Sequence, residues 1–274
     1  MNTISEVVSN KLCTGCGTCA SACPNGAIKI RKFELEGLYL PEIEGDKCKQ
    51  CGICLICCPG HSVNFETLNS RIFGKQPNDN LLGNYQNCYI GYSNEPYVRY
   101  ECASGGIASQ LLIFALEKGM IDGAIVARMS RDQPLETEVF IARTRADVLN
   151  AARSKYCPVT INEALRNVLE CNERYAVVGL PCHIHGIRKA EEVYGVLRKR
   201  IVLRIGLMCA HTVNFNGTEL LLEKIGIDKE QVHEISYRGK GWPGCMTIKT
   251  KGGYNLSIPL IGGWKGSWSI FSCF

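Results

Sequence analysis

Long hydrophobic runs are missing from this sequence. The most apolar stretch, Ile201–Ala210, is interrupted by Arg204, so no segment approaches the roughly 18 apolar residues that a membrane-spanning helix needs. Met1–Asn10 contains an acidic residue and no long apolar core, which argues against a secretory signal peptide. We therefore expect a cytoplasmic protein without a span of its own, whose membrane contacts, if any, go through a partner.

Dense basic patches are also scarce. Arg198-Lys199-Arg200 is the only tight basic run, so nucleic-acid binding is not expected. The charge is nevertheless uneven, because residues 1–66 carry a net charge of −1 and the other 208 residues carry +6. A basic larger domain favours anionic ligands such as phosphate-bearing cofactors. No Gly-x-Gly-x-x-Gly turn joins a predicted strand to a helix, which argues against a standard Rossmann site.

Cysteine, in contrast, is abundant, and eight of the 17 cysteines form two runs with the same spacing. Each run reads Cys-x2-Cys-x2-Cys-x3-Cys-Pro, the spacing of bacterial two-cluster ferredoxins, in which the fourth cysteine binds the other cluster. The predicted ligands of one 4Fe-4S cluster are Cys13, Cys16, Cys19 and Cys58, and those of the second are Cys48, Cys51, Cys54 and Cys23. Glycines between the ligands let the backbone curl around each cluster.

Other uses of these cysteines fit less well. Zinc takes four ligands and does not need a third x2 step followed by x3-Cys-Pro. A disulfide framework belongs to secreted chains, whereas nine cysteines outside the two runs indicate a reducing, anaerobic cytoplasm. Cys57 adjoins Cys58, and Pro59 after Cys58 favours Cys58 as the ligand.

The sequence predicts an α+β protein with two domains. Residues 1–66 form the small ferredoxin-type domain, with strands at Ala27–Lys32 and Leu38–Ile43, and residues 67–96 form a linker. We expect part of that linker to pack through Tyr85, Tyr89 and Tyr92. Residues 97–274 form a larger α/β domain with a mixed sheet, because strands and helices alternate and three antiparallel strands follow at 232–259.

Two turns of the larger domain could hold ligands. Ser104-Gly105-Gly106 precedes a helix at Ile107–Lys118, where small residues and unpaired amides suit an anion, although a plain cap and turn explains them equally well. The expected buried face of that helix is Ile107, Leu111, Leu112, Ala115 and Leu116. The turn Leu180–Gly186 follows a buried strand at Tyr175–Gly179, at the carboxyl edge where open α/β sheets bind ligands. Thr160-x-x-Glu163 predicts a capping box for a helix ending near Leu169.

Together these features resemble the family of coenzyme F420 hydrogenase/dehydrogenase beta subunits. The resemblance covers nearly the whole chain and depends on the order of five motifs behind the ferredoxin-type domain: Ser104–Gly106, Ser154–Tyr156, Val178–Cys182, Gly206–Cys209 and Tyr237–Gly244. Members usually continue beyond the point that corresponds to Cys273–Phe274, so the chain is expected to be a C-terminally shortened form or a fragment.

The resemblance implies an iron-sulfur flavoprotein oxidoreductase that carries FAD and exchanges electrons with coenzyme F420, as the beta subunit of a hydrogenase, formate dehydrogenase or F420H2 dehydrogenase complex. It implies cofactor contacts at Ser104, Gly105, Gly106, Ser154, Lys155, Tyr156, Pro181 and Cys182. Cys182 and Cys209 could also bind a third 4Fe-4S cluster, or be buried free thiols. No catalytic residue is assigned.

Two other functions stay open at this point. The larger domain could be a docking module of a non-catalytic electron-transfer subunit, which would contain no flavin. The chain could instead be a ferredoxin-dependent flavin reductase of an organic substrate, with electrons running from the clusters to the flavin. No residue in the sequence identifies the substrate or the partner subunit.

Overall fold

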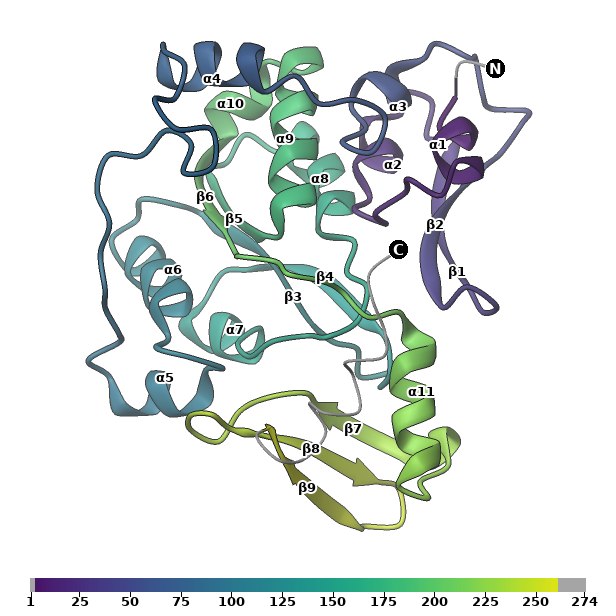
Figure 1. The fold of residues 1–274 in the computed structure, drawn as a ribbon, viewed down its shortest axis with the longest axis vertical. Coiled ribbons are helices and arrows are strands. Elements are labelled where there is room, and N and C mark those ends of the chain that lie inside the picture. The colour runs from purple at the N-terminus through teal and green to yellow at the C-terminus, as the bar shows by residue number, and fades with distance from the viewer. Residues whose placement is uncertain (1–2, 261–274) are drawn as a thin grey trace.

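The structure is a computed structural model that describes residues 3–260, and the strands of this part form three sheets (Figure 1). A two-stranded sheet lies in the N-terminal unit, a four-stranded mixed sheet in the centre, and a three-stranded antiparallel sheet near the C-terminal end of the described chain. The predicted combination of a small ferredoxin-like unit with a mixed α and β remainder is confirmed. The predicted chain end at Cys273–Phe274 lies outside the described residues.

The N-terminal unit contains short helices and one hairpin. Its elements are α1 (Ser5–Ser9), α2 (Thr18–Ala22), β1 (Ile28–Phe33), β2 (Leu38–Ile43) and α3 (Ile53–Ile56). The two strands pair antiparallel and match the predicted strands to within one residue. Helices α2 and α3 each begin after a glycine with positive φ, Gly17 at 84° and Gly52 at 76°, a conformation that other residues adopt at a cost.

The predicted linker contains a helix that the prediction missed. Helix α4 (Phe65–Phe73) is capped by the Asn64 side chain, which accepts a hydrogen bond from the Thr67 amide at 2.9 Å. Arg71 forms an ion pair with Glu192 of the larger domain, so this helix is docked rather than free. The tyrosines expected to pack are exposed instead, with Tyr85 at 62% and Tyr89 at 87% of their surface.

The central sheet has the strand order β4-β3-β5-β6. The strands are β3 (Gly123–Met129), β4 (Thr137–Ala142), β5 (Tyr175–Gly179) and β6 (Ile201–Gly206). Strand β4 is antiparallel to β3, whereas β5 and β6 run parallel to β3 and end at the same edge. The Leu207 amide donates to the Gly179 carbonyl at 2.9 Å, which joins the two chain segments just past that edge.

Helices cover both faces of this sheet (Figure 1). On one face lie α5 (Pro96–Glu101), α6 (Ile107–Glu117) and α7 (Arg145–Asn150), and on the other lie the 3-10 turn η1 (Ile161–Ala164), α8 (Leu165–Glu170), α9 (Pro181–Val193) and α10 (Val196–Arg200). Alternate residues of β5 serve the two layers: Tyr175 and Val177 pack with α8 and α9, whereas Ala176 packs with α6. Both faces of the central sheet carry apolar side chains because helices cover both of them.

The predicted buried face of α6 is right for Leu112 and Ala115 and wrong for Ile107 and Leu111, and two expected side-chain caps are absent. Helix α6 buries Leu112, Ile113 and Ala115, whereas Ile107 and Leu111 keep 41% and 46% of their surface exposed. Gly106 is its N-cap, and no Ser104 side-chain cap is formed. Thr160 likewise makes no capping bond to the backbone at the start of η1, because that segment begins as a 3-10 turn rather than an α-helix.

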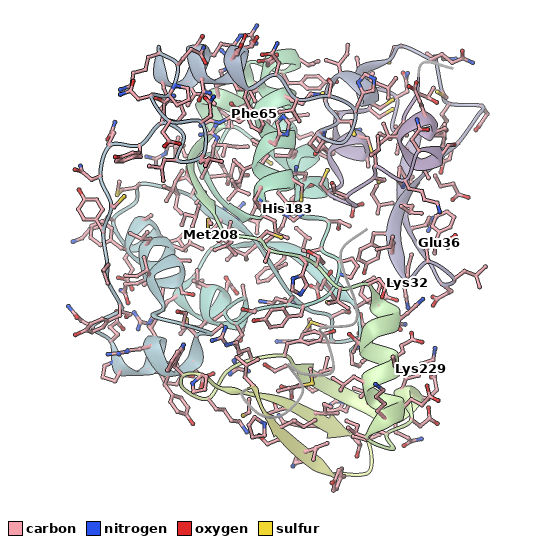
Figure 2. All side chains as sticks on the ribbon, in the orientation of Figure 1. Lys32, Glu36, Phe65, His183, Met208 and Lys229 are labelled. Atoms are coloured by element: carbon pink, nitrogen blue, oxygen red, sulfur yellow. The ribbon has the colours of Figure 1, made fainter. Side chains whose placement is uncertain are left out.

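The C-terminal sheet confirms the predicted antiparallel strands. It consists of β7 (Val232–Ser236), β8 (Cys245–Thr250) and β9 (Asn255–Pro259), and the 3-10 turn η2 (Lys229–Gln231) precedes it. Helix α11 (Phe215–Lys224), which was not predicted, packs on this sheet through Phe215 and Leu222. The Phe215 amide donates to the Gly37 carbonyl at 2.8 Å, so the start of α11 also touches the N-terminal hairpin, near Lys32 and Glu36 in Figure 2. Within residues 3–260, none of the helices has the length and apolar character to cross a membrane.

Candidate iron-sulfur centres and their surroundings

The four cysteines assigned to the first cluster lie together in the structure. Burial raises the pKa of the Cys19 thiol, and the neighbouring sulfurs of Cys16, Cys13 and Cys58 raise it further because thiolate charges repel one another. Burial also raises the pKa of Cys13 to about 11. The Cys13 and Cys19 thiols would therefore stay protonated at neutral pH unless a metal centre displaced their protons.

The four cysteines assigned to the second cluster line a single cavity. Its walls include Cys23, Cys48, Cys51 and Cys54, together with Pro24 and Gly52. Cys23 and Cys54 are buried, whereas Cys51 is exposed at the mouth. Among residues 3–260 no His, Cys, Asp or Glu side chains converge on a single metal ion. A cubane does not require such convergence, because its four thiolates bind four separate irons, so the residues present fit two clusters.

Cys57 and Cys58 point into different surroundings. Cys58 packs with Cys19, Cys54 and other residues of the N-terminal unit. Cys57 is completely buried in the core of the larger domain, near Ile187, and burial raises its pKa to about 12. The ligand set remains a proposal, and these contacts favour Cys58 over Cys57, as the sequence predicted.

The larger domain contacts both cysteine runs through several polar interactions. The Asn162 amide donates to the Cys16 carbonyl at 3.0 Å, and Lys189 Nζ donates to the Cys58 carbonyl at 2.7 Å. The Arg166 guanidinium donates to the Cys23 carbonyl. A Cβ atom on Gly17 would lie 2.8 Å from Glu163 Cγ, so the first cysteine run and η1 are in direct contact. None of these contacts was predicted, because nothing in the sequence marks which larger-domain side chains meet the run.

The carboxyl edge of the central sheet reaches this same place. Pro181 is the first residue of α9, and Cys182 follows it. The Thr14 side chain hydrogen-bonds to Cys182, whose pKa is raised to about 12 by burial, then by the nearby Cys16 and Cys209 sulfurs. The structure thus brings the predicted residues Cys182 and Cys209 close to each other and to the first cysteine run.

His183 and His185, expected in a turn, both lie in α9. His183 is buried near the centre of the molecule (Figure 2); its Nδ1 accepts from the Leu180 amide at 3.0 Å, so Nε2 carries the proton and donates to the Val159 carbonyl at 2.9 Å. Burial lowers the pKa of His183 to about 4, which keeps it neutral at pH 7. His185 stacks on Phe65 of α4, with 6.2 Å between ring centroids.

The predicted anion turn is packed by the chain itself. The Gly105 carbonyl accepts from the Ser93 amide at 2.7 Å, and a Cβ on Gly105 would lie 3.1 Å from the Gly91 carbonyl oxygen. Gly106 has φ +79° and lies against Ser93 and Val98. Internal packing and backbone conformation therefore account for both glycines, while Ser104 is exposed at the turn.

Lys155 is also engaged by the chain. Its Nζ donates to the carbonyls of Ala151, Ala152 and Arg153 beyond the end of α7, and burial lowers its pKa to about 7. The adjacent Tyr156 ring meets Tyr237 edge-on, with 6.1 Å between centroids, and Arg238 donates to the Tyr156 hydroxyl at 3.4 Å. Ser154–Tyr156 and Tyr237–Gly244 are therefore in contact, but the Lys155 ammonium faces carbonyl oxygens, not an open anion site.

Comparison with known protein families agrees with an iron-sulfur domain followed by a larger domain. Residues 12–89 match a model described as a 4Fe-4S dicluster domain. Residues 88–166 match the N-terminal part, and residues 172–269 the C-terminal part, of the beta subunit of coenzyme F420 hydrogenase/dehydrogenase. The chain belongs to the family of coenzyme F420 hydrogenase/dehydrogenase beta subunits. The resemblance in the sequence motifs is thereby confirmed.

Three curated relatives show the range of this family of beta subunits. One subunit of the F420H2 dehydrogenase of Methanosarcina mazei is 30% identical over 94% of this chain and 69% of its own length. The coenzyme F420-dependent sulfite reductase of Methanocaldococcus jannaschii is 30% identical over 86% of this chain but only 36% of its own length. The beta subunit of the coenzyme F420 hydrogenase of Methanosarcina barkeri is 27% identical over 66% of this chain and 63% of its own length. The chain thus spans only part of each of these relatives.

Proposed function

We propose that this chain transfers electrons between coenzyme F420 and two 4Fe-4S clusters, as an oxidoreductase subunit that delivers them to a partner protein. Family membership and the names of the three relatives support the coenzyme and the partner subunit. FAD bound in the larger domain would supply the conversion between a hydride, which carries two electrons, and clusters that accept one electron each.

The contact between Cys182 and the first cysteine run carries this proposal. It joins the ligand-binding edge of the sheet to the cluster of Cys13, Cys16, Cys19 and Cys58. In the second cysteine run Cys51 is exposed, whereas its counterpart Cys16 in the first run is buried. We therefore infer an order of centres that runs from the larger domain to the first cluster, then to the second cluster and the partner. Cys182 and Cys209 are proposed ligands of a third cluster at the inner end of this path.

The flavin contacts are proposed at two places. Ser104 and the backbone of Gly105 and Gly106 form one of them, and Pro181 with Cys182 forms the other. In the segment Ser154–Tyr156, Lys155 Nζ donates hydrogen bonds to three carbonyls of the chain that follows α7. We therefore assign Lys155 a role in supporting the site and no direct phosphate contact. The cytoplasmic location also remains a prediction.

Anaerobic mixing with reduced coenzyme F420 tests this function. Iron-reconstituted, FAD-loaded protein should oxidise the coenzyme and reduce a viologen dye, with both absorbances followed in the two directions. The matched variant is Cys58→Ala, which should lose the first cluster. We expect this variant to keep flavin reduction by the coenzyme and to lose most dye reduction, because the inner cluster lies between the two.

Three results would contradict parts of the proposal. Fast flavin reduction by NADH or reduced ferredoxin, with none by coenzyme F420, would remove the coenzyme. Stoichiometric iron without any bound flavin would favour the docking or electron-carrier alternative. Full dye reduction by Cys58→Ala would overturn the order of centres.

A further inference from the structure

A chain of polar atoms crosses from the larger domain to one cluster ligand. Thr18 Oγ1 lies 3.2 Å from Cys16 Sγ, and Asn162 Nδ2 lies 2.7 Å from the same Thr18 oxygen. Thr18 belongs to α2 of the first cysteine run, whereas Asn162 belongs to η1 of the larger domain. Both side chains are completely buried, so water does not compete for these bonds.

The direction of each hydrogen bond follows from the donors available. Asn162 Nδ2 also lies 2.9 Å from the His183 carbonyl oxygen, which can only accept. The reverse amide orientation would place two acceptor oxygens against each other, so Nδ2 must face both His183 and Thr18. Thr18 Oγ1 therefore accepts from Asn162, and its own proton is left for Cys16 Sγ. A cluster-bound thiolate can only accept, which fixes this last bond as hydroxyl to sulfur.

The surrounding packing holds the hydroxyl in place. A Cβ atom on Gly186 of α9 would lie 2.2 Å from Thr18 Oγ1 and 2.9 Å from Asn162 Nδ2, so the helix backbone presses directly on this pair. The Asn162 backbone is tied to the Cys16 carbonyl as well. Threonine is also restricted at χ1, which limits alternative positions of the hydroxyl.

The second cysteine run has no residue that could donate the corresponding hydrogen bond to a sulfur. Cys16-Gly17-Thr18-Cys19 corresponds to Cys51-Gly52-Ile53-Cys54, so Ile53 occupies the position of Thr18. An isoleucine side chain has no donor for a sulfur. The two clusters would therefore differ in one charge-assisted hydrogen bond although their ligand spacing is the same.

We propose that Asn162 is a positioning residue that holds the Thr18 hydroxyl on the Cys16 sulfur and thereby raises the reduction potential of the inner cluster. Reduction adds negative charge to the cluster and its sulfurs, so a donor on a sulfur stabilises the reduced form more than the oxidised form. The inference rests on the proposed cluster ligands. It gives the larger domain a means to tune the cluster it contacts.

Potentiometric titration followed by electron paramagnetic resonance tests this inference. Thr18→Val keeps the shape and removes the donor, and it should lower the reduction equilibrium constant of one cluster by about tenfold, which is about 59 mV for one electron. Thr18→Ser keeps the hydroxyl and should stay near the wild-type potential. Asn162→Leu should shift the same cluster in the same direction as Thr18→Val, and the double variant should shift no further than Thr18→Val alone.

Ser21→Ala is the matched control. It removes a buried side-chain bond of the same helix, to the Thr18 carbonyl at 3.0 Å, without touching a sulfur. Its potential should be unchanged. An unchanged potential in Thr18→Val would overturn the proposal, and a shift in Thr18→Val but none in Asn162→Leu would remove Asn162 from it. Iron content separates this result from the proposed function: wild-type protein that reconstitutes with fewer than about eight irons contradicts the ligand sets themselves.

Discussion

The two cysteine runs have the same spacing and both contact the larger domain, but they differ in the exposure of their second cysteine, Cys16 or Cys51. In the first run Cys16, Thr18 and Cys19 are buried, and η1 and α9 of the larger domain cover them. In the second run Cys51 is exposed, and Lys49 and Gln50 beside it are exposed as well. Spacing therefore specifies what each run can bind, whereas tertiary contact decides which cluster is inner and which is outer.

This difference has consequences for electron transfer. Solvent exposure and hydrogen bonds to the sulfurs are among the factors that set cluster potentials. The inner cluster would be shielded and would receive the Thr18 bond, while the outer cluster would be open to a partner protein.

Removing one cluster ligand should have the largest effect, because it should remove one of the two clusters and leave the other. Cys58→Ala should lower the iron content by about four per chain, because only the inner cluster loses a thiolate. Cys57→Ala should keep nearly all iron, since Cys57 is buried in the core of the larger domain. Iron analysis with visible absorption after anaerobic reconstitution measures both. Iron loss in Cys57→Ala with retention in Cys58→Ala would reverse the ligand assignment.

Adding one methyl group tests how closely α9 packs against α2 of the first cysteine run. Gly186→Ala places a Cβ 2.2 Å from Thr18 Oγ1 and should lower the free energy of unfolding by about 1–3 kcal/mol through overpacking. Gly45→Ala, just before the outer run, meets no atom within 4 Å and should have little effect. Denaturant unfolding under anaerobic conditions compares the two. Equal stability of both variants would mean that the contact between α9 and α2 is looser than described.

Iron removal gives the smallest expected difference. A hydrophilic iron chelator should extract iron in two phases, with the faster phase from the outer cluster at least about fivefold quicker, because a local opening cost of about 1 kcal/mol protects the buried run. Cys58→Ala protein should show the fast phase alone. A single phase in wild-type protein, or a slow phase alone in the variant, would show that exposure of Cys51 does not control access.

Local sequence patterns predicted the repeated and strictly local elements. The β1–β2 hairpin and the antiparallel strands of the C-terminal sheet agree with expectation, because each depends on near neighbours. A family model matches the dicluster domain that the cysteine spacing predicted. The predicted buried face of α6 was right only in part, because an apolar helix such as Ile107–Glu117 offers more than one apolar stripe. Which stripe is buried depends on where the sheet lies, and Ile113 turned out to face it.

The surroundings of the predicted ligand residues were not foreseen either. Lys155 was a candidate contact for the FAD phosphates or ribose, and in the structure its Nζ donates to three carbonyls that follow α7. A lysine in a sequence does not show which acceptors will surround it. The segment Phe65–Phe73 was missed as a helix although Asn64 and Gly74 are recognisable caps, so there a usable signal was present.

The sequence by itself determined that this chain could bind two 4Fe-4S clusters, because ligand spacing is encoded in consecutive residues and needs no distant partner. Only the tertiary structure decided which larger-domain residues surround each cysteine run. The contacts that distinguish the two runs join Thr18 to Asn162 and Cys16 to Cys182, more than 140 residues apart in the chain. Such pairs form because α9 and η1 pack on one face of the sheet and leave room there for α2, and that placement follows from the burial of the whole core rather than from any single motif.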